Sequence, residues 1–124
     1  MNYIKKNLVI ALLMLASIGS AQNMDTSEKL LHHVLLFQWS QGHDINTKAE
    51  VVNLFKGLPD KIEGLESFEI LDIIASSGNF ESVLIFKFSS EEALQVYQEH
   101  SDHLRIKKIA PPLLSGFAEY DYWN

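Results

Sequence analysis

The residues with the clearest chemical potential lie in one short stretch, YQEHSDHL, residues 97–104. If the stretch is helical, it places Tyr97, His100 and His103 within two turns of the helix. Histidine titrates near neutral pH and can accept and return a proton, and a tyrosine hydroxyl can donate a hydrogen bond beside it. Three interpretations fit this spacing: a metal site, an acid–base pair in a pocket, or ordinary residues at a helix end, with His100 capping the helix.

The metal site is the weakest of these interpretations. His100 and His103 are three residues apart, so on a helix they share a face. A catalytic zinc ion takes about three protein ligands, and HSDH lacks the glutamate of a His-Glu-x-x-His motif. His32 and His33 are neighbours on an expected strand and point to opposite faces, so they cannot both contribute. We therefore predict no metal and no other cofactor.

Patterns of apolar residues predict the elements that position this stretch. Four segments have strand character, residues 32–39, 68–74, 82–88 and 117–123. A first helix begins at the capping box Thr47–Glu50 and ends at Gly57. A second begins at the capping box Ser89–Glu92 and continues to Ile109, before two prolines. The order βαββαβ predicts an α+β, ferredoxin-like fold, with both helices on one face of an antiparallel four-stranded sheet.

The first and third predicted strands carry apolar residues on both faces. The helices cover one face, and the chain has no further element for the other. A large exposed apolar patch is unusual on a monomer. We therefore predict that a second copy of the chain covers this face, which gives a homodimer with the architecture of a dimeric α/β barrel. The alternative is a monomer whose second sheet face is solvated.

The N-terminus has the order of a secretory signal peptide. Lys5 and Lys6 precede an apolar run, residues 8–18, and the small residues Gly19-Ser20-Ala21 follow it. The run is shorter than the ~20 residues of a comfortable membrane span. We predict a signal peptide over residues 1–21, a secreted or periplasmic protein, and no stable membrane anchor after cleavage. The alternative is a retained N-terminal anchor.

The predicted mature chain has a flexible leader, residues 22–31, and one domain, residues 32–124. The formal net charge of the whole chain is −6, and loss of Lys5 and Lys6 makes the mature protein more acidic. An acidic surface repels phosphate backbones, so nucleic acid is not an expected partner. The chain has no cysteine and therefore no disulfide.

Four segments resemble the Dabb, or stress-responsive α/β-barrel, family. They are HHVLLFQW, GLPDKIEGLESFEI, SVLIFKFSSEEALQVYQEHSDHLRI and the closing FAEYDYW, so the resemblance extends from His32 to Trp123. It implies a dimeric barrel of two ferredoxin-like units, in agreement with the burial pattern. Ser101 stands where the family usually has a proline after the first histidine.

The resemblance also implies roles for individual residues. A plant polyketide cyclase of this family uses a tyrosine and a histidine at positions that match Tyr97 and His103, without a metal or organic cofactor. A histidine on its first strand matches His33. Leu35 and Phe37 share strand parity with His33 and are expected to line the same cavity. We predict Tyr97 and His103 as catalytic residues, and as substrate-binding residues His33, Leu35, Phe37 and His100.

The expected function is binding of a small apolar or aromatic molecule, with cofactor-free acid–base chemistry of the cyclase or lyase type as its further step. One alternative is a non-catalytic, stress-related or scaffold protein, in which Tyr97 and His103 are sealed in packing. A further alternative is a function like that of monooxygenase-like or haem-binding relatives with the same fold. The sequence does not decide whether the protein is an enzyme.

Overall fold

The computed structural model describes residues 28–124 of the chain. The predicted signal peptide, residues 1–21, lies outside the described residues, as do residues 22–27 of the predicted leader. The regular structure begins at Leu31, the last residue assigned to that leader. The helices and strands are β1 (Leu31–Trp39), α2 (Ile45–Gly57), β2 (Leu65–Asp72), β3 (Ser82–Phe88), α3 (Glu91–Glu99), α4 (Ser101–Ile109) and β4 (Leu114–Trp123).

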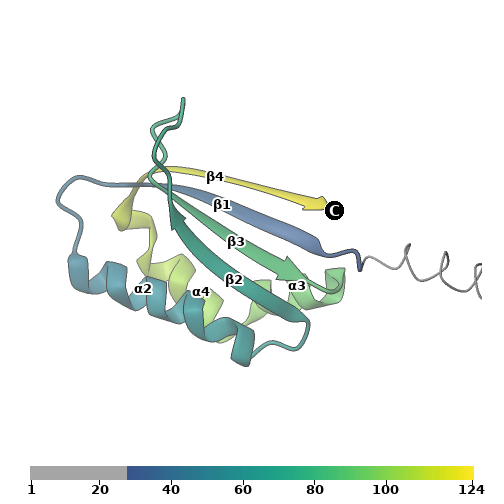
Figure 1. The fold of residues 1–124 in the computed structure, drawn as a ribbon. Coiled ribbons are helices and arrows are strands. Elements are labelled where there is room, and N and C mark those ends of the chain that lie inside the picture. Colours follow the sequence, from purple (N-terminus) through teal and green to yellow (C-terminus); the bar gives the residue numbers. More distant parts are fainter. Residues whose placement is uncertain (1–27) are drawn as a thin grey trace, which may run out of the picture.

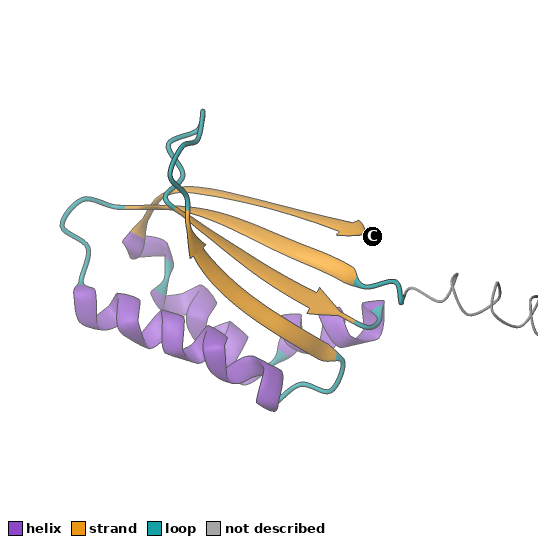
Figure 2. Cartoon of the chain, in the orientation of Figure 1, coloured by secondary structure: helices purple, strands orange, loops and turns teal. Residues whose placement is uncertain are grey.

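The four strands form one antiparallel sheet in the order β2-β3-β1-β4 (Figure 1). All three helices lie on the same face of this sheet (Figure 2). The predicted ferredoxin-like α+β fold is therefore confirmed. Two short 3₁₀ helices, Leu58–Asp60 and Pro111–Leu113, connect α2 to β2 and α4 to β4. None of the helices in residues 28–124 combines the length and the hydropathy needed to cross a membrane.

The local sequence explains where α2 begins. Its N-cap is Asp44, whose Oδ1 accepts hydrogen bonds from the backbone N–H groups of Asn46 and Thr47 at 2.8 and 3.0 Å. The prediction that Thr47 caps this helix is wrong, since Asp44 satisfies the free donors three residues earlier. The next helix begins one residue later than the predicted capping box Ser89–Glu92 places it, because its N-cap is Ser90, whose hydroxyl accepts from Ala93 N–H at 3.1 Å.

The prediction of one continuous helix up to Ile109 is wrong. His100 has extended backbone angles, φ −63° and ψ 140°, and separates α3 from α4. Its ring Nδ1 accepts a hydrogen bond from Asp102 N–H at 3.0 Å and so caps α4. Polar residues such as Ser101 and Asp102 favour helix starts over helix interiors, which explains the break. The break makes α3 and α4 separate helices, and α4 lies beside α2 on the helix side of the sheet (Figure 1).

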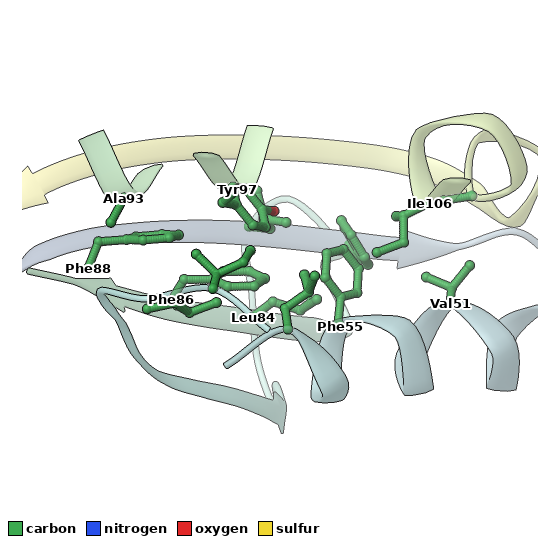
Figure 3. Packing of buried hydrophobic residues seen from close by; sticks show 14 of the residues in the cluster. Val51, Phe55, Leu84, Phe86, Phe88, Ala93, Tyr97 and Ile106 are labelled. Atoms are coloured by element: carbon green, nitrogen blue, oxygen red, sulfur yellow. The ribbon is translucent and has the colours of Figure 1, made fainter. Parts of the chain in front are cut away.

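The main core lies between the sheet and the helices. The odd-numbered residues of β1 and the even-numbered residues of β3 point into it, because side chains alternate along a strand. Figure 3 shows side chains from α2, β3, α3 and α4 meeting in this cluster. The largest side chains that it buries completely are Tyr97, Phe55, Phe86 and Phe88.

The opposite face of the sheet is largely apolar too. It carries Val34 and Leu36 of β1, and among residues 28–124 no helix covers it (Figure 2). Leu71 of β2 and Tyr120 and Tyr122 of β4 point the same way and are 48%, 52% and 45% exposed. The burial pattern read from the sequence is therefore present, and we call this surface the open face.

Candidate functional site

A cavity of about 750 Å³ lies between the sheet and the helices. Its walls come from β1 and β4 on one side and from α2, α3 and α4 on the other. Five of the six residues predicted to form a site line it, namely His33, Leu35, Phe37, Tyr97 and His103. The sequence pattern placed these residues on two separate elements, and the fold brings them to one space.

His33 lies on β1 and is 5% exposed. Its Nδ1 donates a hydrogen bond to Oδ1 of Asp121 at 2.6 Å. The two residues face each other across the β1–β4 pairing. Because the carboxylate accepts a hydrogen bond from Nδ1–H, Nε2 of the neutral ring carries no proton and can act as a hydrogen-bond acceptor. Asp121 therefore fixes the orientation of the His33 ring and the nitrogen it offers to its surroundings.

Tyr97 on α3 is 1% exposed, and its hydroxyl has no hydrogen-bond partner within residues 28–124. Burial raises the pKa of this hydroxyl well above its ordinary value, and the negative charges of Glu119 and Asp121 raise the pKa further. Tyr97 thus keeps its proton at physiological pH and stays a donor. A buried donor without an acceptor costs about 1–3 kcal/mol.

His103 on α4 is half-buried, and its ring centroid lies 4.3 Å from that of Tyr97. Its Nδ1 donates to the backbone carbonyl of Gln98 at 3.0 Å, so Nε2 of the neutral ring is an acceptor. Burial lowers the pKa of His103, and Lys107 and His33 act in the same direction. The bond to Gln98 and the charge of Glu119 partly oppose this shift. His103 is therefore neutral at pH 7 and able to accept a proton.

This lowered pKa predicts a pH dependence of stability. As the pH falls below about 6.5, the ordinary pKa of histidine, the unfolded chain binds a proton at His103 that the folded chain does not, so the free energy of unfolding decreases. The decrease ends once the pH is below the folded-state pKa. Urea unfolding of the wild type and His103→Gln between pH 5 and 8 measures it. The variant should lose less stability on acidification, and parallel curves would contradict the shift.

His100 does not line the cavity, unlike the other predicted site residues. Its ring is engaged at the start of α4, where Nδ1 accepts from Asp102 N–H. This is the helix-end role that the sequence left open as an alternative. His100 is therefore not part of the candidate ligand site.

Several lining residues were not predicted as site residues. They include Phe55 of α2, Lys107 of α4 and Phe117 and Glu119 of β4, and Asp121 lies behind His33. A signal for the β4 residues was present, because Phe117, Glu119 and Asp121 alternate along the strand and share one face. For metal binding, residues 28–124 hold no group of three or more histidine, aspartate or glutamate side chains with suitable spacing.

Comparison with known proteins agrees with this fold. The profile of the stress responsive A/B barrel domain family, Dabb, matches residues 31–124. A dabb family protein with a ferredoxin-like fold from Mesorhizobium loti is 24% identical, with a TM-score of 0.62 over 76% of this chain and 95% of that chain. A dimeric protein of unknown function with a ferredoxin-like fold from Bacteroides fragilis is 24% identical, with a TM-score of 0.58 over 75% of this chain and 94% of that chain.

A hydroxynitrile lyase from Passiflora edulis is also similar, with a TM-score of 0.69 over 79% of this chain and 95% of that chain, at 9% identity. Identities this low show a shared fold. The comparison with curated protein sequences finds no match. The family profile, in contrast, covers every helix and strand from β1 to β4. The chain therefore belongs to the Dabb family of stress-responsive A/B barrel domains.

Proposed function

We propose that this protein is an exported homodimer that binds a small apolar or aromatic molecule in the cavity and carries out cofactor-free acid–base chemistry there, of the cyclase or lyase type. The observation that carries the proposal is the Tyr97 hydroxyl, which is buried beside the neutral ring of His103 and has no hydrogen-bond partner among residues 28–124. Most buried hydroxyls are satisfied within the fold. Tyr97 is among the residues that line the cavity, and a ligand bound there can bring the acceptor that residues 28–124 do not supply.

The remaining wall suits an apolar body. Leu35, Phe37, Phe55, Ile106 and Phe117 supply aliphatic and aromatic surface. Ligand sites commonly combine such surface with a few polar groups that fix the orientation of the ligand. The volume of about 750 Å³ lies in the range of small-molecule sites.

The chemistry follows from the protonation states of the two residues. Nε2 of His103 can accept a proton from a hydroxyl or an acidic C–H group of the bound molecule. The Tyr97 hydroxyl can donate a hydrogen bond to the adjacent oxygen, on which negative charge then develops. Because its pKa is raised, Tyr97 holds its proton during this step and acts as an electrostatic stabiliser. Return of the proton from His103 completes the cycle.

Export and dimerisation rest on separate observations. The signal-peptide pattern of residues 1–21 supports export. The open face and the dimeric nature of the similar protein from Bacteroides fragilis support a homodimer. A dimer through the open face leaves the cavity intact, since the cavity lies on the helix side of the sheet.

Substitution of Tyr97 by phenylalanine tests the ligand site. Without ligand, Tyr97→Phe should melt at or above the wild-type temperature, because it removes an unsatisfied buried hydroxyl. With small aromatic carbonyl compounds, its affinity should fall about twofold to tenfold, the worth of one neutral hydrogen bond. Thermal-shift screening followed by isothermal titration calorimetry measures both quantities. His103→Ala should abolish turnover of any compound that the wild type converts.

Tyr120→Phe is the matched control, because Tyr120 is 52% exposed on the open face, away from the cavity. Its ligand profile should equal that of the wild type. Identical profiles in the wild type, Tyr97→Phe and His103→Ala would remove both side chains from any ligand site. They would favour a scaffold protein in which these residues only pack.

A further inference from the structure

The connection between β2 and β3 continues as a short hairpin beyond the sheet. The backbone N–H of Ile73 donates a hydrogen bond to the carbonyl of Glu81 at 2.9 Å, which extends the pairing of the two strands. Figures 1 and 2 show this hairpin projecting past the end of the sheet, on the side away from the helices. It therefore projects on the side of the open face, and we call residues 73–81 the arm.

The arm has packing of its own at its turn. The Ser76 hydroxyl accepts from Gly78 N–H at 3.2 Å, and the Ser76 carbonyl accepts from Asn79 N–H at 3.4 Å. The ring of Phe80 lies against Gly78, where an added Cβ would come within 2.7 Å of it. Phe80 thus uses its apolar surface within the arm, and the hairpin has a defined shape.

Ile74 of the arm is fully exposed, although isoleucine is among the residue types most often buried. Leu71, which precedes the arm on β2, is 48% exposed on the open face. The two side chains extend the apolar surface of the open face past the end of the sheet. Removing such a side chain from water is favourable in proportion to its apolar area, so a partner of the open face gains by covering Ile74 as well.

Exposed aromatic surface lies toward the opposite end of the open face. Tyr120 and Tyr122 of β4 stack on each other with ring centroids 6.1 Å apart. Tyr122 also stacks on His32 of β1, with a centroid distance of 4.6 Å. Tyrosines are common anchors of protein interfaces. This end of the open face therefore offers an aromatic platform that suits an apolar side chain.

Charge distinguishes the two ends of the open face. Residues 71–81 contain two acidic residues, Asp72 and Glu81, and no basic one. At the far end Lys87 of β3 pairs with His32, and Glu69 of β2 lies beside that pair. Lys87 forms no ion pair with any residue in the range 28–124. Two arms side by side would bring like charges together, whereas an arm over the far end meets a lysine, so charge favours the second arrangement.

The arm is long enough to reach a second subunit. Two sheets packed face to face lie about 10 Å apart. From Ile73 to Ser77 the arm extends by four residues, or about 13 Å at 3.3 Å per residue. A contact from the arm of one subunit to the far end of the other occurs twice in a dimer with two-fold symmetry.

We propose, on the basis of the proposed homodimer, that the arm of each subunit lies on the open face of a second copy of this chain, with Ile74 against the partner's Tyr120 and Tyr122. The interaction surface is thus the open face together with the arm. The two-fold axis then places the arm end of one sheet over the tyrosine end of the other.

Substitution of Ile74 by serine tests the contribution of the arm. The dimer dissociation constant of the mature protein should rise at least about tenfold in Ile74→Ser, because each dimer loses two apolar contacts. Sedimentation equilibrium measures it. Ile45→Ser is the matched control, because Ile45 is 77% exposed on α2, on the helix side of the sheet. It should leave the dissociation constant unchanged. An equal dissociation constant in Ile74→Ser and the wild type would overturn the proposal.

Introduced cysteines locate the contact, since the chain has none of its own. Two double variants combine Ile74→Cys with either Tyr120→Cys or Tyr122→Cys. At least one should form covalent dimers on mild oxidation, seen by non-reducing gel electrophoresis, because a disulfide needs Cα atoms within about 7 Å. The single variants, and Ile45→Cys combined with Tyr120→Cys, should stay non-covalent.

Three results distinguish the arm contact from the homodimer itself. A monomeric wild type at micromolar concentration would overturn both. A dimeric wild type with no effect of Ile74→Ser would overturn the arm contact and leave the homodimer in place. Covalent dimers from Ile74→Cys alone would place the two arms against each other and overturn the contact with the tyrosines.

Discussion

Replacement of Phe86 by alanine is expected to lower the free energy of unfolding by about 3–5 kcal/mol. Phe86 is fully buried on β3, and its ring lies at the centre of an aromatic cluster. Its centroid is 4.8 Å from that of Phe68 on β2, 5.1 Å from that of Tyr97 on α3 and 5.5 Å from that of Phe55 on α2. The substitution removes a ring that joins two strands to two helices, and the surrounding rings cannot all collapse onto the space it leaves.

This prediction also concerns the candidate site. The ring centroid of Phe86 is 5.5 Å from that of His33, so Phe86 supports both His33 and Tyr97 from behind. We expect Phe86→Ala to weaken ligand binding even at temperatures where the variant is folded. Urea unfolding followed by circular dichroism, at one fixed protein concentration, gives the change in stability. Val96→Ala is the control, because Val96 is 52% exposed on α3, and it should change stability by less than about 0.5 kcal/mol. A loss below about 1 kcal/mol for Phe86→Ala would contradict this view of the core.

The fold was predictable because local signals agreed with one another. The bounds of β3, Ser82–Phe88, match the sequence prediction at both ends, since a turn cluster precedes the strand and the Ser90 cap follows it. Where two local signals competed, the prediction failed. The helix that contains Tyr97 keeps an apolar pattern past His100, and only the capping geometry at His100 shows that the chain starts a new helix there. The start of β4 at Leu114, three residues before the predicted one, follows two prolines that carry little strand signal.

The site was predictable only in part, for a different reason. The parity of His33, Leu35 and Phe37 on β1 was enough to place them on one face. The bond between His33 and Asp121 joins residues 88 positions apart and depends on the register between β1 and β4. That register is set by the packing of the whole sheet, so no local pattern contains it. The free hydroxyl of Tyr97 is likewise a property of its surroundings, which the residue type alone does not determine.

The second large effect is expected at the open face. Leu36 lies on central strand β1, between Val83 of β3 and Ala118 of β4. In a dimer joined through the open face this residue is buried in both subunits. Leu36→Glu would place two unpaired carboxylates in that interface, and an uncompensated buried charge costs about 3–5 kcal/mol. We therefore expect the dimer dissociation constant to rise at least about hundredfold, so that the variant is a folded monomer at micromolar concentration.

Sedimentation equilibrium, with circular dichroism to show that the fold is kept, measures this effect. Leu104→Glu is the matched control, because it introduces the same charge on the helix side, where Leu104 is 52% exposed. It should remain dimeric, so that the comparison separates the position of the charge from the charge itself. A monomeric wild type at micromolar concentration would remove the homodimer from the proposed function. A Leu36→Glu variant as dimeric as the wild type would show that the subunits meet through another surface. In either case the cavity would keep its walls, since every residue assigned to it belongs to the helix side of one subunit.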